Sequence, residues 1–237
     1  MNATILLNDI RDYCLSNASE ENVKKSQRYF KDKFDGYGLT APLIYAKVKE
    51  MLASKKFGLL EVLEAYPILA QNGKWEEISI GLLLVNGFSK EYTTETFKTI
   101  SEWFSFSIYN WGHADVLGMY ILPRFIADGI LTVDDFSGWL RSPYKFQRRC
   151  VPVTLIKPMK KTRQVSSYIW FVEPLMNDSE REVHQGVGWF LREAWKIQSD
   201  ETEAFLLKWK ETAPRLILQY ACEKMTAQKK FRFKRSK

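Results

Sequence analysis

Hydrophobic residues recur along the chain at spacings of three and four, the periodicity of helices that bury one face. Strand-like alternation is nowhere sustained beyond a few residues. The pattern predicts helices over residues 19–34, 40–54, 58–70, 75–85, 93–106, 111–126, 133–140, 143–156, 162–176, 180–197 and 201–226. Because short loops join these segments, the chain is predicted to be all-α.

Residues typical of helix ends support these boundaries. Ser19 is an N-cap candidate followed by two glutamates, and Gly36 and Gly38 end the first segment. Thr40 and Pro42 then begin the second segment, because proline is tolerated in the first helical turn.

Pro152 interrupts the segment that Ser142 and Pro143 begin. A proline inside a helix clashes with the carbonyl four residues earlier, here that of Arg148. Two outcomes are open: a helix that kinks at Pro152, or one that ends at Cys150.

The order of the predicted helices indicates a repeat architecture. Antiparallel helix pairs of roughly 35 to 45 residues are the unit of HEAT-like α-solenoids, whose curvature gives a concave face. No linker rich in proline, glycine or serine divides the chain. We therefore expect one α-solenoid domain over residues 1–226 with a basic concave face, followed by a basic C-terminal tail over residues 227–237.

The formal charge of +7 is distributed very unevenly. Residues 224–237 hold seven basic residues and no acid, so residues 1–223 are formally neutral. Residues 136–172 also lack acids but carry eight cations: Arg141, Lys145, Arg148, Arg149, Lys157, Lys160, Lys161 and Arg163. Such segregation favours an anionic partner, with nucleic acid ahead of a membrane surface. The alternative for the tail is a solvated segment with no partner.

Several chemistries are disfavoured by what the sequence lacks. Three cysteines far apart do not suggest a disulfide framework and indicate a reducing compartment. Two histidines without ligand spacing make a metal site unexpected, and phosphate-loop and nucleophile-elbow motifs are absent. We therefore expect no cofactor and no metal. No apolar run approaches ~18 residues, so we expect a cytoplasmic protein that does not span a membrane.

Trp111 and Asp115 stand four residues apart in a predicted helix, which places an indole and a carboxylate on one face. Spacing alone favours a capping or ion-paired surface acid at Asp115. Trp189, between Val187 and Leu191, would likewise be a core residue more often than a site residue.

Four segments in register resemble the AlkD-like DNA glycosylases, HEAT-like-repeat enzymes of alkylation repair. They are YNWGHAD at 109–115, FQRR at 146–149, GVGWFLRE at 186–193, and RYFK at 28–31 running on to GLTAP at 38–42. The resemblance implies an active site formed by the positions of Trp111, Asp115, Arg148 and Trp189, with Tyr29 helping to line it.

The same resemblance implies a function. The expected activity is removal of cationic alkylated purines, such as N3-methyladenine and N7-methylguanine, from double-stranded DNA without base flipping. The expected protein is a monomer that associates with the nucleoid when bound to DNA. Contacts to DNA would come from Tyr29 and from five cations of the acid-free segment: Arg149, Lys157, Lys160, Lys161 and Arg163.

Elementary chemistry agrees with so short an inventory of groups. An N3- or N7-alkylated purine is already cationic and leaves as a neutral base, so no general acid is needed. Asp115 would stabilise the oxocarbenium-like sugar and position water, the tryptophans would add cation–π stabilisation, and Arg148 would hold a phosphate. The resemblance places no lysine as a nucleophile, so base removal without strand cleavage is expected.

Two other classes of function are open. One is a non-catalytic HEAT-like paralogue that recognises bent or branched DNA. Gly112 and His113 support it, because a bulkier aromatic residue and an acid are common there in the family. The other is a protein-binding α-solenoid scaffold, since fold does not fix function.

Overall fold

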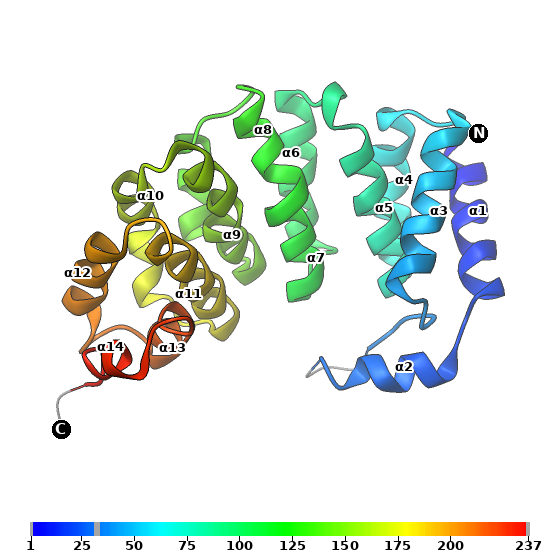
Figure 1. Cartoon of the computed structure of the whole chain (residues 1–237). Helices are drawn as coiled ribbons and strands as arrows, with labels where there is room; N and C mark the ends of the chain where they lie inside the picture. The colour runs from blue at the N-terminus through cyan, green and yellow to red at the C-terminus, as the bar shows by residue number, and fades with distance from the viewer. Residues whose placement is uncertain (1, 31–33, 236–237) are drawn as a thin grey trace. The chain divides into compact units, whose positions relative to one another are not determined.

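The structure, a computed structural model, describes residues 2–30 and 34–235. All regular elements in these residues are helices, which confirms the all-α prediction (Figure 1). The chain divides into two compact units, Met1–Tyr109 and Asn110–Lys237. The expected single domain over residues 1–226 stays a prediction. Among the described residues, no helix combines the length and hydrophobicity that a membrane-spanning segment needs.

The described residues of the N-terminal unit form six α-helices. Within it α1 and α3 pack against α5, and α1 also contacts α4. Short 3-10 helices at Ser89–Glu91 and Trp103–Ser105 flank the last helix. The α-helices are α1 (Asn2–Ser16), α2 (Glu20–Gln27), α3 (Ala41–Ser54), α4 (Leu59–Gln71), α5 (Trp75–Gly87) and α6 (Thr94–Glu102).

A buried carboxylate organises the loop before α3. Glu76 accepts hydrogen bonds from the backbone N–H groups of Tyr37, Gly38 and Leu39, at 2.8, 2.8 and 3.0 Å. Gly38 has φ 82°, a left-handed conformation that favours glycine. One side chain on α5 thus accepts the backbone hydrogen bonds of a loop that has no regular secondary structure.

The C-terminal unit contains the remaining helices. The first three elements form one continuous helix whose middle turn, Leu117–Ile121, is a π-helix. Further 3-10 helices span Asp134–Arg141 and Glu173–Asn177. The α-helices are α7 (Trp111–Val116), α8 (Leu122–Ala127), α9 (Lys145–Thr162), α10 (Val165–Val172), α11 (Arg181–Trp195), α12 (Ser199–Trp209), α13 (Arg215–Ala221) and α14 (Ala227–Phe231).

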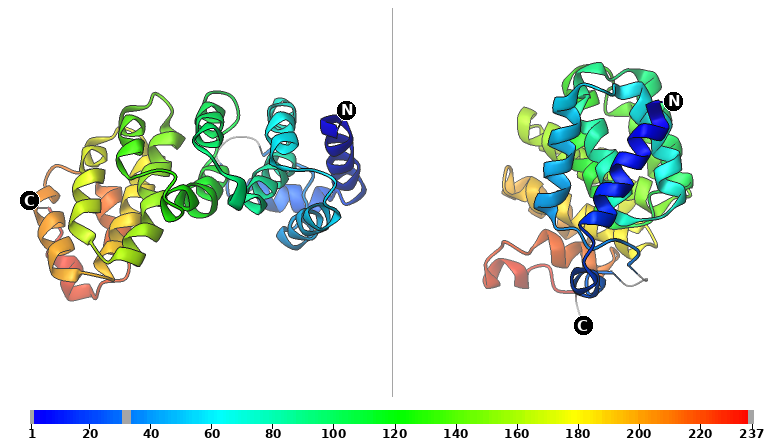
Figure 2. Two further views of the ribbon diagram at one scale, coloured as in Figure 1. Left: turned by 90° about the horizontal axis from the view of Figure 1, so that it is seen from above. Right: turned by 90° about the vertical axis from the view of Figure 1, so that its right-hand side faces the viewer.

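Three long helices of this unit lie side by side and run in the same direction: the continuous helix α7–α8, helix α9 and helix α11 (Figures 1 and 2). Contacts near their beginnings and near their ends establish the parallel arrangement. Arg149 contacts Asp115 on α7 and the Glu182 carbonyl on α11. Further along, Lys157 lies over the Tyr120 ring and Lys160 pairs with Glu193.

Helix α9 is continuous from Lys145 to Thr162, through both Pro152 and Pro158. The alternative in which the helix ends at Cys150 is therefore wrong. Burial overrides the local penalty, because Pro152 and most side chains around it are enclosed by the neighbouring helices. The expected start at residues 142–143 is also displaced, since Ser142 precedes the N-cap residue Tyr144.

Other helix predictions differ from the structure in identifiable ways. Helix α1 has no counterpart among them. Helix α2 ends at Gln27, although the segment was expected to run to residue 34; residues 31–33, including Lys31 of the RYFK segment, lie outside the described residues. The expected helix over residues 201–226 is broken between Trp209 and Arg215, because Pro214 disfavours helical backbone at Ala213.

The expected basic tail is folded as far as residue 235. Helix α14 places Lys229 and Arg232 against Glu203, at 2.7 and 2.6 Å. Phe233 is buried, and Arg235 donates to the Ala213 carbonyl at 2.6 Å. Much of the positive charge of this segment is therefore used inside the C-terminal unit.

Candidate active site

The centre of the candidate site is an ion pair between Asp115 on α7 and Arg149 on α9. Arg149 Nε and Nη2 donate to the two carboxylate oxygens of Asp115, both at 2.9 Å. The third guanidinium nitrogen, Nη1, donates to the Glu182 carbonyl at 2.7 Å. This bidentate arrangement fixes the plane of the carboxylate.

Three local features support the helices around this ion pair. Asn110 caps α7 by accepting a hydrogen bond from the backbone N–H of His113 at 2.9 Å. Behind Asp115, the Cys150 thiol lies 3.1 Å from the Ala114 carbonyl. Gly186 lets α11 approach closely, since a Cβ there would lie 3.1 Å from Arg149 Cγ. A side chain at residue 186 would therefore meet Arg149 at a closer than usual contact distance.

Asp115 is partly buried but remains reachable. Burial raises the pKa of its carboxyl group, whereas the hydrogen bonds and charge of Arg149 act to lower it. The Asp115 side chain keeps 19% of its surface exposed, compared with 6% for Arg149. Each carboxylate oxygen can accept a second hydrogen bond, so Asp115 can interact with another group while Arg149 holds it.

The two tryptophans expected at the site belong to the same set of helices. Trp111 is the first residue of α7, one turn before Asp115, and its side chain is 41% exposed. Trp189 is half-buried on α11, three residues after Gly186 and thus on the helix face that meets α9. The C-terminal unit thus carries Trp111, Asp115, Arg149 and Trp189 on three adjacent parallel helices.

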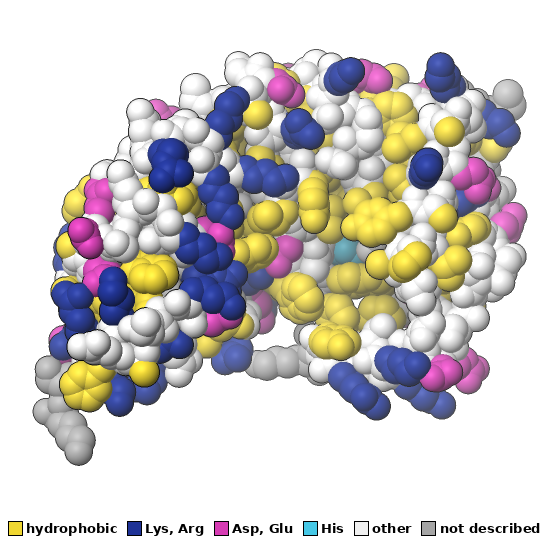
Figure 3. All heavy atoms as spheres, viewed as in Figure 1, with side chains coloured by type: hydrophobic (Ala, Val, Ile, Leu, Met, Phe, Trp, Pro, Cys, Tyr) yellow, Lys and Arg dark blue, Asp and Glu magenta, His cyan; other side chains and the backbone are white. Residues whose placement is uncertain are grey.

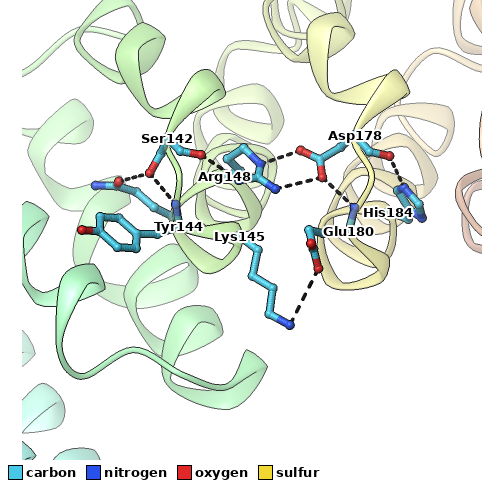
Figure 4. Close-up of polar contacts among 8 residues, drawn as sticks. Ser142, Tyr144, Lys145, Arg148, Asp178, Glu180 and His184 are labelled. Carbon is cyan, nitrogen blue, oxygen red and sulfur yellow. Dashed lines mark hydrogen bonds and ion pairs between the residues drawn. The ribbon is translucent and has the colours of Figure 1, made fainter.

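Arg148, which was expected to hold a phosphate, makes a second bidentate pair. Its Nε and Nη2 donate to Asp178, at 2.6 and 3.1 Å, and its Nη1 donates to the Ser142 carbonyl at 2.7 Å. Figure 4 shows this guanidinium enclosed between the turn before α9 and the turn before α11. The structure therefore places Arg149, and not Arg148, against Asp115.

The surroundings of Arg148 are a structural network (Figure 4). Asp178 also accepts the backbone N–H of Glu180 at 2.8 Å, and its carbonyl lies 2.5 Å from a ring nitrogen of His184. The Ser142 hydroxyl accepts from the Tyr144 N–H at 3.1 Å. These contacts fix the start of α9 relative to the start of α11, and hence the neighbouring Arg149.

The other expected DNA contacts fall into two groups. Lys157, Lys161 and Arg163 are exposed near the end of α9, where Arg163 adopts φ 59°. Lys160 is also exposed but pairs with Glu193 at 2.6 Å. Arg149 is buried in the pair with Asp115 and therefore does not have the exposed guanidinium expected of a phosphate contact. Figure 3 shows Lys and Arg side chains gathered over the C-terminal unit.

Tyr29 lies in the N-terminal unit, just beyond α2, and is 73% exposed. The other expected site residues lie in the C-terminal unit. A role for Tyr29 at the site stays a prediction. Within the described ranges, no group of three or more His, Cys, Asp or Glu side chains is arranged to hold a metal ion.

The role of Arg149 in positioning Asp115 was missed in the sequence, although a signal existed. On α9, Arg149 is three residues after Phe146 and four before Val153, so it shares the apolar face of the helix. An arginine on a buried face requires an acid partner. The same holds for Arg148, three residues before the apolar Val151, so this signal predicts an acid partner for both arginines and does not single out Arg149.

Comparisons with known proteins identify the family and the fold. Residues 11–225 match the family model described as DNA alkylation repair enzyme. The fold is similar to that of a solved chain described as a predicted DNA alkylation repair enzyme from Enterococcus faecalis, with a TM-score of 0.75 and 16% identity, covering 89% of this chain and 98% of that one. No curated protein matches the chain. Since the family model covers most of the sequence, the chain belongs to the DNA alkylation repair enzyme family.

Proposed function

We propose that this protein is a DNA glycosylase that hydrolyses the N-glycosidic bond of cationic alkylated purines, such as N3-methyladenine and N7-methylguanine, in double-stranded DNA. Family membership supports a role in DNA repair. The observation that carries the specific proposal is the Asp115 carboxylate, held by Arg149 and still partly exposed one turn from Trp111.

The reaction needs one fixed anion and no proton donor. As the bond from C1′ to the purine nitrogen breaks, its electron pair neutralises the positive charge of the alkylated base. The sugar gains oxocarbenium character, and Asp115 stabilises that charge. Because Arg149 already orients the carboxylate, little reorganisation is needed at the moment of reaction.

Water completes the hydrolysis. A water oxygen forms the new bond to C1′, and the released proton passes to Asp115 or to solvent. The free lone pairs of the Asp115 oxygens can orient this water, since Arg149 occupies only one position on each oxygen. The products are a free base and an abasic site in an intact strand.

Trp111 and Trp189 supply electron-rich ring faces. A cation close to an indole face is stabilised by ~0.5 to 2 kcal/mol. Both the alkylated purine and the developing sugar cation carry such a charge. The exposed surface of Trp111 makes it the better placed of the two rings to meet DNA.

We assign the contacts to the DNA phosphates to exposed cations of the C-terminal unit. Lys157, Lys161 and Arg163 can approach phosphates. Arg148 acts through Asp178 as a positioning residue for α9. A HEAT-like monomer suffices for this mode of binding, because one chain supplies both the carboxylate and the cations.

A non-catalytic DNA-binding protein is the second candidate. The observation that favours it is the same ion pair, because both oxygens of Asp115 already accept hydrogen bonds from Arg149. In that case the pair would serve only to join α7 to α9, as the Arg148–Asp178 pair joins α9 to the turn before α11.

Release of free N7-methylguanine from methylated duplex DNA, followed by chromatography, separates the two candidates. Wild-type protein should release the base, and Asp115→Asn should bind the DNA but release at least ~10²-fold less. Asp178→Asn is the matched control, since it removes the charged partner of Arg148, which lies next to Arg149 on α9 and forms the other bidentate pair. Full release by Asp115→Asn, or none by the wild type, would contradict the glycosylase proposal.

A further inference from the structure

A cavity of about 350 Å³ opens between α8, the second half of α9 and the start of α10. Much of its lining is apolar; this apolar part, here called the floor, includes Pro123, Ile126, Pro158 and Tyr168. Three cations line it as well: Arg124, Lys157 and Lys161. The volume is in the range of pockets that hold small organic ligands.

The positive charge of this cavity is not neutralised within the part of the chain that the structure describes. Arg124, Lys157 and Lys161 form no ion pair with a described carboxylate, and no acid lines the cavity. Their neighbour Lys160, by contrast, pairs with Glu193 at 2.6 Å. Burial and then the charge of Arg124 lower the pKa of Lys157. An anion in the cavity would relieve the repulsion between these cations.

The π-helical turn aligns the cavity with the candidate active site. Asp115 lies before this turn, which adds one residue, so Tyr120 follows Asp115 on the same face of the helix. Arg124 comes one α-helical turn later. On α9, Lys157 is eight residues beyond Arg149, about 12 Å along a helix that rises about 1.5 Å per residue.

Beside the cavity, α9 contacts the continuous helix α7–α8 through a second pair of side chains. The Lys157 ammonium lies 5.0 Å from the centroid of the Tyr120 ring, which is half exposed. Since one DNA strand carries a phosphate about every 3.4 Å of helix axis, 12 Å corresponds to about three to four nucleotides. A strand whose sugar lies at Asp115 therefore reaches the cavity with a nucleotide about three to four positions away.

We propose that this cavity binds one nucleotide of a DNA strand, with its phosphate on Arg124, Lys157 and Lys161 and its sugar or base against Tyr120 and the apolar floor. The presence of a strand here rests on the proposed function. A phosphate alone would leave the floor unfilled, whereas a nucleoside alone would leave the three cations unmatched. A nucleotide matches both halves of the cavity.

Calorimetric titrations with deoxyadenosine 5′-monophosphate, deoxyadenosine and inorganic phosphate test the ligand class. The nucleotide should bind at least ~10-fold more tightly than either part. Arg124→Gln and Lys157→Gln should each weaken nucleotide binding about 10-fold, whereas Arg215→Gln removes an exposed charge on α13 and should have no effect. Equal binding of phosphate and nucleotide, or equal effects of all three substitutions, would overturn the proposal.

A second measurement tests whether the nucleotide belongs to a strand. Lys157→Gln should raise the Kd for a short duplex containing N7-methylguanine, and excess deoxyadenosine 5′-monophosphate should compete with that duplex in the wild type but not in the variant. Nucleotide binding with an unchanged duplex Kd would overturn the strand assignment.

Failure of this proposal can be distinguished from failure of the proposed function. Asp115→Asn should retain nucleotide binding at the cavity while losing base release. Base release by the wild type without any cavity-dependent nucleotide binding would remove the cavity proposal alone. Cavity-dependent binding without base release would remove the glycosylase proposal alone.

Discussion

Two arginines next to each other on α9 form the same kind of ion pair with different consequences. Arg148 and Arg149 each bind an aspartate through two hydrogen bonds, and each donates a third to a backbone carbonyl. Asp178 also accepts a backbone N–H and keeps 6% of its side-chain surface exposed, whereas Asp115 keeps 19% and lies one turn from Trp111. Ion-pair geometry alone therefore does not distinguish the two aspartates, whereas their remaining exposure favours Asp115 as the candidate for chemistry.

The comparison predicts that removal of Arg149 has the largest effect. Arg149→Met would leave Asp115 buried without its partner, at a cost of about 3 to 5 kcal/mol in the free energy of unfolding. Base release should fall with it, because nothing would hold the carboxylate plane. Urea unfolding and chromatography of released N7-methylguanine measure the two effects. A stable and fully active variant would show that the pair does not position Asp115.

Loss of charge at the two aspartates separates structure from chemistry. Asp115→Asn and Asp178→Asn should both lower the unfolding midpoint, because each leaves an arginine with a neutral partner. Only Asp115→Asn should reduce base release by ~10² or more. Single-turnover rates at saturating enzyme remove differences in DNA affinity. Equal loss of rate in both variants would show that Asp115, like Asp178, acts only by stabilising the fold.

Glu193 extends the comparison to pH. Burial opposes its ionisation, but hydrogen bonds and charge from Lys160 and Lys196 lower its pKa from 4.5 to about 2. A carboxyl group with a lowered pKa in the folded state stabilises the protein above 4.5, and this contribution is lost as pH falls towards about 2. Thermal unfolding should show Glu193→Gln less stable than wild type at pH 6 by about 2 kcal/mol. The difference should shrink below pH 4.5, and a pH-independent difference would contradict the assignment.

The smallest effect concerns cations that are already paired. Lys229 and Arg232 already pair with Glu203, so their joint replacement by Gln should leave the salt dependence of DNA affinity nearly unchanged. Lys161→Gln, at an exposed position without an ion pair among the described residues, should flatten the slope of log affinity against log salt by about 0.9. Fluorescence anisotropy at several salt concentrations measures both, and identical slopes would contradict the distinction.

The sequence predicted the parts of this fold that depend on local pattern. The all-α class, the 40–54 helix and the placement of Trp111 and Asp115 on one helix follow from periodicity and spacing, and the structure confirms them. It did not distinguish Arg148 from Arg149, because neighbouring helical residues differ by only about 100° in direction. The partner of Arg148 lies 30 residues further along, beyond α10, where spacing carries no information.

Tertiary packing also decided where helices continue. Pro152 and Pro158 lie inside a helix that is enclosed on several sides, whereas the half-buried Pro214 lies between two helices and is the N-cap residue of α13. The same residue type thus has opposite effects in two contexts. Packing also decides the position of the basic C-terminal segment. Its composition resembles that of a solvated tail, but its Lys229 and Arg232 pair with Glu203.

The prolines inside α9 make the helix that carries both arginines dependent on its neighbours. Each proline removes one intrahelical N–H, and an 18-residue helix with two such gaps has little tendency to form by itself. A peptide of residues 145–162 should therefore be unstructured in water. We therefore expect α9 to depend on its packing against α7–α8 and α11, and the ion pairs on it to form cooperatively with that packing. Base release would then report complete assembly of this unit, since no partly folded fragment could hold Asp115 in place.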